Sequence, residues 1–393
     1  MLRTEVDVTS HATPASSLFQ SFFLGGFECS SHRRHDGRRL DVLASTQHDV
    51  RAADDYRLLA THGIRTVRDG LRWHLVEQRP GHYDWASFEP MLRAARETGA
   101  QVIWDLMHYG WPDDIDIWSA AFVDRFARFA RAAARLHRDT TDAVPFWTPV
   151  NEISFFAWGG ADVACMNPFG RGRGGELKDQ LVRAAIAAIE AVREVDPRAR
   201  IVTAEPLIHV HPRSSRAEDV EAARRYTQLS QMEATDFLAG LRRPDLGGKP
   251  EYLDIVGLNY YHNNQWVDCG AMVGRDDPRH VPLRDLLARV HAHYRRPLFI
   301  AETGIEGDAR AGWFSYVAAE AEAAIAAGTP VEGVCLYPIL NHLGWDDDRY
   351  CPNGLLCGVA EGGARDVHQP LADELARWQD RMAGDHSASA AAA

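Results

Sequence analysis

The chain has 393 residues, of which 46% are hydrophobic and 25% are charged, and these values are ordinary for a soluble enzyme. Its formal net charge is −12 at pH 7 and its arginines are scattered along the chain, which argues against a nucleic-acid partner. No apolar run in the sequence approaches the ~20 residues that cross a bilayer, so we expect no membrane partner.

The expected compartment follows from the N-terminus and the cysteines. Residues 1–27 carry acidic side chains early and lack a sustained apolar region before a small-residue cleavage site, so they do not resemble a signal peptide. Six cysteines in a chain of this length do not make a disulfide scaffold. Cys351 and Cys357 could pair or bind a metal, but neither a His nor a second Cys pair completes a zinc-like spacing. We therefore expect a cytoplasmic protein with no metal and no other cofactor, and the role of these two cysteines stays open.

Short apolar runs alternate with helical patterns along the whole chain. Eight runs have the length and composition of buried strands: 22–27, 64–70, 100–107, 145–150, 200–205, 253–261, 297–302 and 331–338. Apolar residues at three- and four-residue spacing predict helices at 54–63, 88–99, 122–137, 181–197, 221–229, 283–294, 314–328 and 371–382. Eight such alternations favour a (β/α)8 barrel, because a doubly wound sheet rarely reaches eight units and no Gly-x-Gly-x-x-Gly follows a strand.

The predicted fold class is therefore α/β, with a single-domain barrel and long loops after the strands. We place an N-terminal extension at 1–21, the barrel at 22–380, and a disordered low-complexity tail at 381–393.

In such a barrel the active site lies at the carboxyl ends of the strands. Polar and aromatic residues stand at all eight predicted ends: Glu28, Arg68, Asp69, Asp105, His108, Asn151, Glu152, Glu205, Asn259, Tyr260, Tyr261, Glu302, Asn341, His342 and Trp345. Two glutamates surrounded by amides and aromatic rings suit glycoside hydrolysis, which needs one carboxylic acid to protonate the leaving oxygen and one carboxylate to attack or to activate water. Loop tryptophans such as Trp111, Trp158 and Trp266 could stack on a sugar.

Two motifs carry a family resemblance. The segment WTPVNE, which ends at Glu152, and the later IAETG, which contains Glu302, resemble glycoside hydrolase family 1, within the clan-A retaining glycosidases. The resemblance extends over about residues 22–358. It implies that Glu152 is the acid/base, that Glu302 is the nucleophile, and that the carbohydrate substrate is a β-glycoside.

Further segments agree with that family. TVRDGLRW implies that Arg68 lies beside the nucleophile, and DLMHYGWP implies that His108 binds the sugar. DIVGLNYY places Asn259 in the pocket and implies that Tyr261 donates to the nucleophile. GVCLYPILNHLGW aligns with the strand-eight segment and makes Trp345 the expected sugar platform, while Asn151 is expected to hold the sugar 2-hydroxyl.

The sequence also departs from the family pattern. The strand-one Gln-Ile-Glu is replaced by SSHRRHDG, and the strand-eight glutamate that clamps sugar hydroxyls is Gly344. We hypothesise that Gly344 makes room for a bulkier, charged or modified sugar and that the arginines at 33, 34, 38 and 39 meet an acidic group on it. The protein is therefore expected to be a divergent relative whose sugar, linkage, aglycone and oligomeric state the sequence does not name.

Several assignments keep alternatives. Glu205 is expected to accept from a sugar hydroxyl or to support the site from behind, and Glu28 and Asp69 either replace lost sugar ligands or pair with nearby arginines. The expected substrate-binding set is His108, Trp111, Asn259, Glu205, Glu28, Asp69, Asn341, His342 and Trp345. The predicted function is a retaining β-glycosidase. A transglycosylase that uses the same residues and a catalytically silent carbohydrate-binding barrel are the alternatives.

Overall fold

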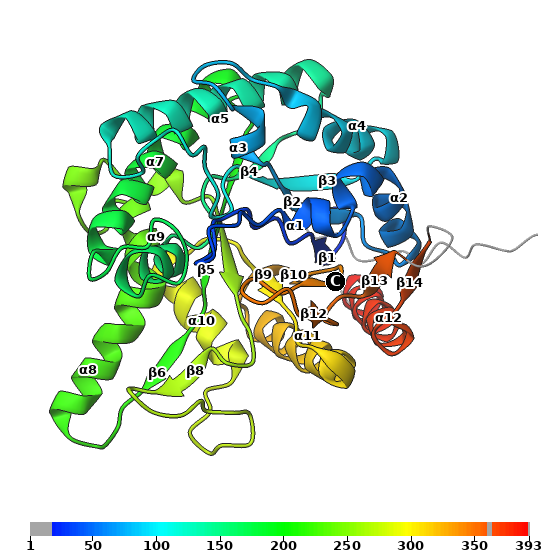
Figure 1. Cartoon of the computed structure of the whole chain (residues 1–393). Helices are drawn as coiled ribbons and strands as arrows, with labels where there is room; N and C mark the ends of the chain where they lie inside the picture. Colours follow the sequence, from blue (N-terminus) through cyan, green and yellow to red (C-terminus); the bar gives the residue numbers. More distant parts are fainter. Residues whose placement is uncertain (1–17, 360–363, 392–393) are drawn as a thin grey trace, which may run out of the picture.

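Parallel strands close into a barrel in the computed structural model, which describes residues 18–359 and 364–391 (Figure 1). The eight strands found there are β1 (Phe23–Gly26), β2 (Thr66–Gly70), β3 (Gln101–Asp105), β4 (Phe146–Thr148), β5 (Arg200–Pro206), β7 (Ile255–Asn259), β9 (Leu298–Thr303) and β10 (Val331–Leu336). They follow one another around the barrel in chain order, and β1 closes it by pairing with β10. The predicted (β/α)8 barrel is confirmed.

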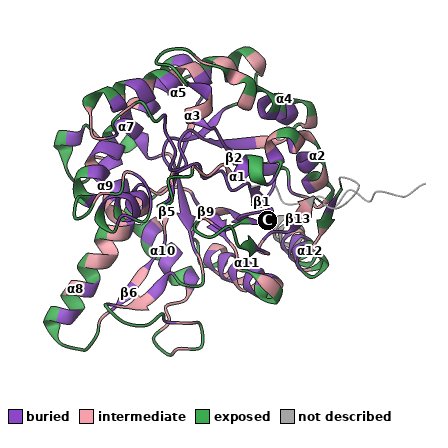
Figure 2. Ribbon diagram, in the orientation of Figure 1, coloured by how far each residue is buried: buried purple, intermediate pink, exposed green. Residues whose placement is uncertain are grey.

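Helices surround the barrel. The outer ring and its loops contain α1 (Val42–Ser45), α2 (His48–Thr61), α3 (Trp73–Val76), α4 (Glu89–Thr98), α5 (Ala120–Thr140), α6 (Ile153–Ala157), α7 (Gly174–Val195), α8 (Ala217–Thr227), α9 (Glu233–Leu238), α10 (Leu283–Tyr294), α11 (Arg310–Ala326) and α12 (Gln369–Ala391). Buried residues concentrate on the strands and on the inner sides of these helices (Figure 2). This is the arrangement that apolar residues at helical spacing predict.

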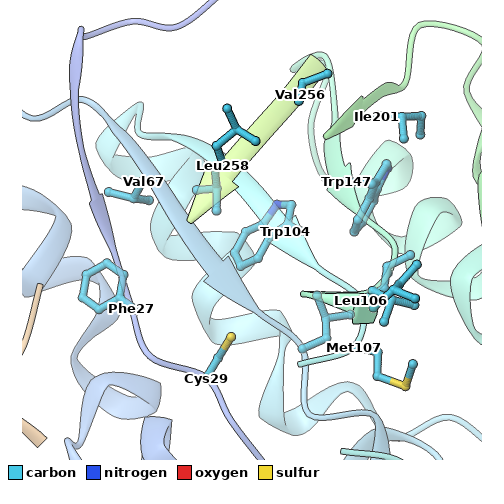
Figure 3. Packing of buried hydrophobic residues seen from close by; sticks show 14 of the residues in the cluster. Phe27, Cys29, Val67, Trp104, Leu106, Met107, Trp147, Ile201, Val256 and Leu258 are labelled. Atoms are coloured by element: carbon cyan, nitrogen blue, oxygen red, sulfur yellow. The ribbon is translucent and has the colours of Figure 1, made fainter. Parts of the chain in front are cut away.

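The core has two parts because successive strand residues point to opposite faces. Ile103 belongs to a cluster that includes Phe146 and Phe299, whereas its neighbour Trp104 belongs to the larger cluster that reaches the helices. Figure 3 shows members of that larger cluster, among them Val67, Trp104 and Trp147.

Residues on both sides of the predicted barrel boundaries have defined structure. Phe19, in the predicted extension, is buried and packs edge-on against Phe299 with ring centroids 5.0 Å apart, so the barrel core begins before residue 22. Helix α12 continues to Ala391, through most of the tail that we predicted to be disordered. Alanine has the highest helix propensity, and an alanine-rich composition is as compatible with a helix as with disorder.

Several short elements were not predicted from the sequence. Strands β6 (His209–His211) and β8 (Gln265–Val267) pair with each other and, with α8, project from the barrel (Figure 1, lower left). Two π-helices, η2 (Trp158–Asp162) and η3 (Gln228–Met232), follow α6 and α8. Two hairpins pair β11 (His342–Leu343) with β12 (Tyr350–Cys351), and β13 (Leu356–Val359) with β14 (Arg365–Val367).

The remaining helical elements are short 3-10 turns: η1 (Trp85–Ser87), η4 (Pro244–Leu246), η5 (Pro250–Tyr252) and η6 (Gly307–Ala309). Across the described residues, no helix combines the length and the apolarity that a membrane span requires.

Candidate active site

A cavity of about 530 Å³ lies at the carboxyl ends of the barrel strands. Its charged and amide-bearing lining residues are Glu28, His108, Glu152, Asn263, Asn264 and Glu302. Its aromatic lining residues are Tyr109, Phe155, Trp158, Tyr226, Tyr261, Trp266 and Trp345. The cavity therefore offers carboxylates at its base and several rings that could stack on a flat ligand face.

Glu302 is held by two donors. It lies on β9 with 4% of its surface exposed. The guanidinium of Arg68 donates to one carboxylate oxygen at 2.6 Å, and the hydroxyl of Tyr261 donates to the other at 2.8 Å. Arg68 is completely buried and is itself fixed by Asp105, which accepts two hydrogen bonds from it at 3.0 and 2.6 Å. This arrangement stabilises an ionised Glu302.

Glu152 faces the same cavity from the end of β4. It caps the N-terminus of α6 and has a φ of 43°, in the left-handed region that non-glycine residues rarely adopt. The hydroxyl of Tyr109 donates to one of its oxygens at 2.6 Å, and the amide of Asn259 donates to the other at 2.9 Å. Asn259 is the register partner of Glu302 on the neighbouring strand. The register of β7 against β9 therefore links the positions of the two glutamates.

The electrostatics differ between the two carboxyl groups. Burial raises the pKa of Glu152, the hydrogen bonds from Tyr109 and Asn259 oppose that rise, and the charge of Glu205 adds to it. Burial also raises the pKa of Glu302, to about 7, with the cation of Arg68 lowering it and the charge of Glu152 raising it. The charge on Glu152 thus disfavours ionisation of Glu302, and the two carboxyl groups titrate as a pair.

No protein-family model and no curated protein sequence matches this chain. Solved structures do match it. A family 1 β-glucosidase from Thermotoga maritima is 19% identical, with a TM-score of 0.72 over 85% of this chain and 87% of that one. A β-glucosidase from the same organism in complex with deoxynojirimycin is 18% identical, with a TM-score of 0.76 over 92% and 98% of the two chains. The chain has the fold of the family 1 β-glucosidases.

Within this fold, most of the predicted catalytic and supporting side chains meet in one network. Asn151 accepts a hydrogen bond from Arg68 at 2.6 Å, and its amide nitrogen lies 3.0 Å from Nε2 of His108 and 2.9 Å from the hydroxyl of Tyr109. Both hydrogens of its amide nitrogen thus have protein partners in the free protein. A sugar 2-hydroxyl that accepts from this nitrogen would have to compete with His108 or Tyr109.

Three of the predicted substrate-binding residues line the cavity: Glu28, His108 and Trp345. Glu28 is 7% exposed and its carboxylate lies 3.7 Å from His108. Burial opposes ionisation of Glu28, but the charges of His108 and His342 and the hydrogen bond from Ser30 outweigh it and lower the pKa. Glu28 therefore presents a carboxylate beside His108.

Asp69 does not reach the cavity. Its carboxylate accepts from the hydroxyl of Tyr56 at 2.6 Å and lies 2.8 Å from His48, and both partners belong to α2. Successive strand residues point to opposite faces, so Asp69 faces the helices while Arg68 faces the barrel interior. Its predicted place among the substrate-binding residues is withdrawn.

Trp111 and Asn341 also lie outside the cavity. Trp111 packs against Phe122 and Phe156 in the core and donates to the carbonyl of Ile115 at 3.3 Å. Asn341 donates to the hydroxyl of Tyr350 at 2.9 Å and accepts from the backbone of Gly354 at 2.7 Å, so it fixes a loop.

His342 and Glu205 are also absent from the cavity lining. The ring of His342 lies against the carbonyl of Leu343 and the side chain of Asn353, at 2.6 and 3.1 Å. Glu205 accepts from the backbone nitrogen of Ser154 with both oxygens, at 3.4 and 3.1 Å, and burial raises its pKa to about 7. The supporting alternative for Glu205 thus fits its position better than contact with sugar.

The hypotheses for Gly344 and the arginines also need correction. A side chain at Gly344 would meet Asp347 at 2.7 Å and Cys351 at 3.7 Å, so this glycine permits a tight hairpin tip and does not enlarge the cavity. Arg33 and Arg39 are engaged by Asp113, and Arg34 and Arg38 are engaged by Asp348. These arginines are already neutralised by aspartates and are absent from the cavity lining.

One important residue was missed. Tyr109 follows His108 directly in the sequence, and no role was predicted for it. Its hydroxyl contacts both Asn151 and Glu152. Its position in the sequence could have indicated a role, because its phenol comes directly after His108, a predicted sugar-binding residue at a strand end.

Three buried groups are close enough to be considered as metal ligands: Cys29, Asp105 and His108, whose ligand atoms lie within 4.8 Å of one another. Burial and the charges of Asp105 and Glu28 raise the pKa of the Cys29 thiol well above its usual range. A metal needs the thiolate, and Asp105 already carries the cation of Arg68. The three side chains fit a hydrogen-bonded cluster better than a metal site.

Proposed function

We propose that the protein is a retaining β-glycosidase in which Glu302 is the nucleophile and Glu152 is the acid/base. One observation carries this proposal: the two glutamates reach one cavity from β4 and β9, and within the described residues only Glu302 of the two accepts from a guanidinium. A retaining mechanism needs this asymmetry, with one ionised carboxyl and one that can carry a proton.

The first step forms a glycosyl-enzyme. A carboxylate oxygen of Glu302 bonds to the anomeric carbon as the bond from that carbon to the leaving oxygen breaks. Glu152 gives its proton to the leaving oxygen, which departs as an alcohol. Arg68 and Tyr261 keep Glu302 aligned for attack, and burial raises the pKa of Glu152, the direction that a general acid needs.

The second step releases the sugar. Glu152, now a carboxylate, takes a proton from water while the water oxygen bonds to the anomeric carbon and the bond to Glu302 breaks. Both glutamates return to their starting states. In this mechanism Trp345 stacks on the sugar ring, and Glu28 and His108 bind the hydroxyl groups of the sugar.

A transglycosylase is the second candidate. The cavity has a strongly aromatic side formed by Trp158, Tyr226 and Trp266, and Trp158 is 42% exposed. Such a surface could hold an acceptor molecule that takes the place of water in the second step. Product analysis with added acceptor alcohols separates the two activities.

The proposed function is tested with a panel of 4-nitrophenyl glycosides that covers both anomers and several sugars. We expect release of nitrophenol from β-glycosides only, and at least a 10³-fold loss in Glu302→Gln, which keeps the shape but removes the negative charge. Glu97→Gln, the same change at an exposed position on α4, is the control. Equal release by wild type and Glu302→Gln would refute the assignment of Glu302.

A further inference from the structure

A single chain of hydrogen bonds joins the two candidate catalytic glutamates. Arg68 donates to Glu302 and also to the amide oxygen of Asn151, each at 2.6 Å. Asn151 in turn donates to the hydroxyl of Tyr109 at 2.9 Å, and Tyr109 donates to Glu152 at 2.6 Å. Arg68 thus contacts Glu302 at one end, and Tyr109 contacts Glu152 at the other.

The direction of each hydrogen bond follows from the chemistry of the groups. Arginine has only donors, so the Asn151 atom that meets it is the carbonyl oxygen, and the amide hydrogens then point toward His108 and Tyr109. Because the Tyr109 oxygen accepts from Asn151, its own hydrogen is free to point to Glu152. The phenol is therefore presented to Glu152 as a donor.

The backbone supports this contact at some conformational cost. Tyr109 has a φ of 65° and Glu152 a φ of 43°, so both partners occupy the left-handed region. Non-glycine residues rarely adopt it, and such residues cluster at functional sites. The neighbouring Gly110 allows the close packing, since a side chain there would meet the Ser31 hydroxyl oxygen at 2.0 Å.

The ring of Tyr109 is held independently of its hydroxyl. Its centroid lies 4.7 Å from that of His108, 5.4 Å from that of Phe156 and 5.6 Å from that of Trp345. The side chain is completely buried. A phenylalanine in its place would keep these ring contacts and remove only the hydroxyl.

We propose that Tyr109 is a positioning residue for the acid/base, whose hydroxyl orients Glu152 and favours its carboxylate form. This inference rests on the proposed function, in which Glu152 must alternate between acid and carboxylate. Burial and the charge of Glu152 raise the pKa of Tyr109 well above its usual range, so the phenol remains a donor throughout the working pH range.

The proposal has a specific consequence for the base step. When Glu152 is a carboxylate, a donor at 2.6 Å stabilises it and aims its free lone pairs into the cavity. When Glu152 is protonated, the same contact is weaker. Loss of the hydroxyl therefore raises the pKa of Glu152, and the alkaline limb of the pH profile moves to higher pH.

Other groups around Glu152 also affect its titration. They are His108 after β3, Glu205 at the end of β5, Tyr261 after β7 and Glu302 on β9. Tyr109→Phe leaves all of them in place. A shift in that variant therefore reports the hydroxyl of Tyr109.

The test compares Tyr109→Phe with Tyr261→Phe, the matched removal of the phenol that donates to Glu302. In each variant the kcat/KM profile is measured on the 4-nitrophenyl β-glycoside that wild type cleaves best. We expect Tyr109→Phe to move the alkaline limb up by about one pH unit, the effect of one hydrogen bond to a charged group. Tyr261→Phe should move the acidic limb up instead.

A second readout needs no turnover. With ¹³C-labelled glutamate, the carboxyl carbon of Glu152 is assigned by its loss in Glu152→Gln, and its pKa is measured in wild type and Tyr109→Phe. A higher pKa in Tyr109→Phe supports the proposal, and an unchanged pKa overturns it. If Glu152→Gln keeps full activity, the proposed function fails separately, because Glu152 is then not the acid/base.

Discussion

The guanidinium of Arg68 lies 2.6 Å from Glu302 and 2.6 Å from Asp105, and all three groups are buried. Two carboxylates therefore share one cation beneath the cavity. The cation opposes the effect of burial on Glu302, which is 4% exposed and whose pKa burial raises to about 7.

Replacing Arg68 tests that relationship. Arg68→Met should lower kcat/KM by at least 10³-fold and destabilise the protein by about 3–5 kcal/mol, because Asp105 and Glu302 lose their shared cation inside the barrel. Arg68→Lys keeps the charge but cannot bond both carboxylates with a planar fork, so it should recover much of the stability and little of the activity. Chemical denaturation and steady-state kinetics measure the two effects, and wild-type activity in Arg68→Met would contradict them.

Because of Glu205, we expect the stability of the folded protein to depend on pH. Its pKa is raised to about 7 by burial, so the folded state favours the protonated form. This preference contributes its full stabilisation of the folded state below about pH 4.3, the ordinary pKa of a glutamate in the unfolded chain. The stabilisation is lost as the pH rises through 7. Glu205→Gln removes the titrating group and should stabilise the protein at pH 8 by on the order of 2 kcal/mol, with little effect at pH 4.

The measurement is the melting temperature of wild type and Glu205→Gln across pH 4 to 9. A constant difference between the two proteins at every pH would show that the titration of Glu205 does not govern stability.

Substitutions of Asp69 and Glu28 distinguish a carboxylate that supports the structure from one that binds substrate. Asp69→Asn should lower the melting temperature by several degrees and leave KM unchanged, because Asp69 bonds to His48 and Tyr56 on the helix side of β2. Glu28→Gln should raise KM and leave the melting temperature nearly unchanged, since Glu28 lines the cavity. An altered KM in Asp69→Asn would return that residue to the substrate-binding set.

We expect a substitution that loosens the tip of the β11–β12 hairpin to affect substrate binding indirectly. Arg34 donates to the carboxylate of Asp348 at 2.6 Å and to the carbonyl of Asp346 at 2.5 Å, on the turn that carries Trp345. The ring of Trp345 also packs edge-to-face with that of His32, with centroids 5.1 Å apart. Arg34→Met should free this turn and raise KM roughly fivefold with kcat nearly unchanged, an effect of about 1 kcal/mol.

Arg33→Met is the control for this prediction. Arg33 precedes Arg34 in the same loop but pairs with Asp113, so it does not hold the hairpin tip. Equal changes in KM for the two variants would mean that the loop as a whole, and not the contact from Arg34, positions Trp345.

Local sequence patterns determined the barrel and the candidate glutamates. Runs such as 22–27 and 297–301 are apolar on both faces, as strands between a barrel interior and a helix layer must be, and the helices between the strands have the periodicity of one buried face. These signals lie within a few residues of each other, so they survive when sequence identity to similar structures is only 18–19%. The strand ends then indicated Glu152 and Glu302, and the motif around each gave it a proposed role.

Only the tertiary structure decided which strand-end residues share the cavity. Arg68 and Asp69 are neighbours in sequence, yet the first contacts Glu302 and the second contacts α2, because a strand turns successive side chains to opposite faces. The contact between Tyr109 and Glu152 joins loops after two adjacent strands, and its geometry depends on the register of β3 against β4 and on two left-handed backbone positions. Register and loop conformation are set by packing across the whole barrel, which no local pattern encodes.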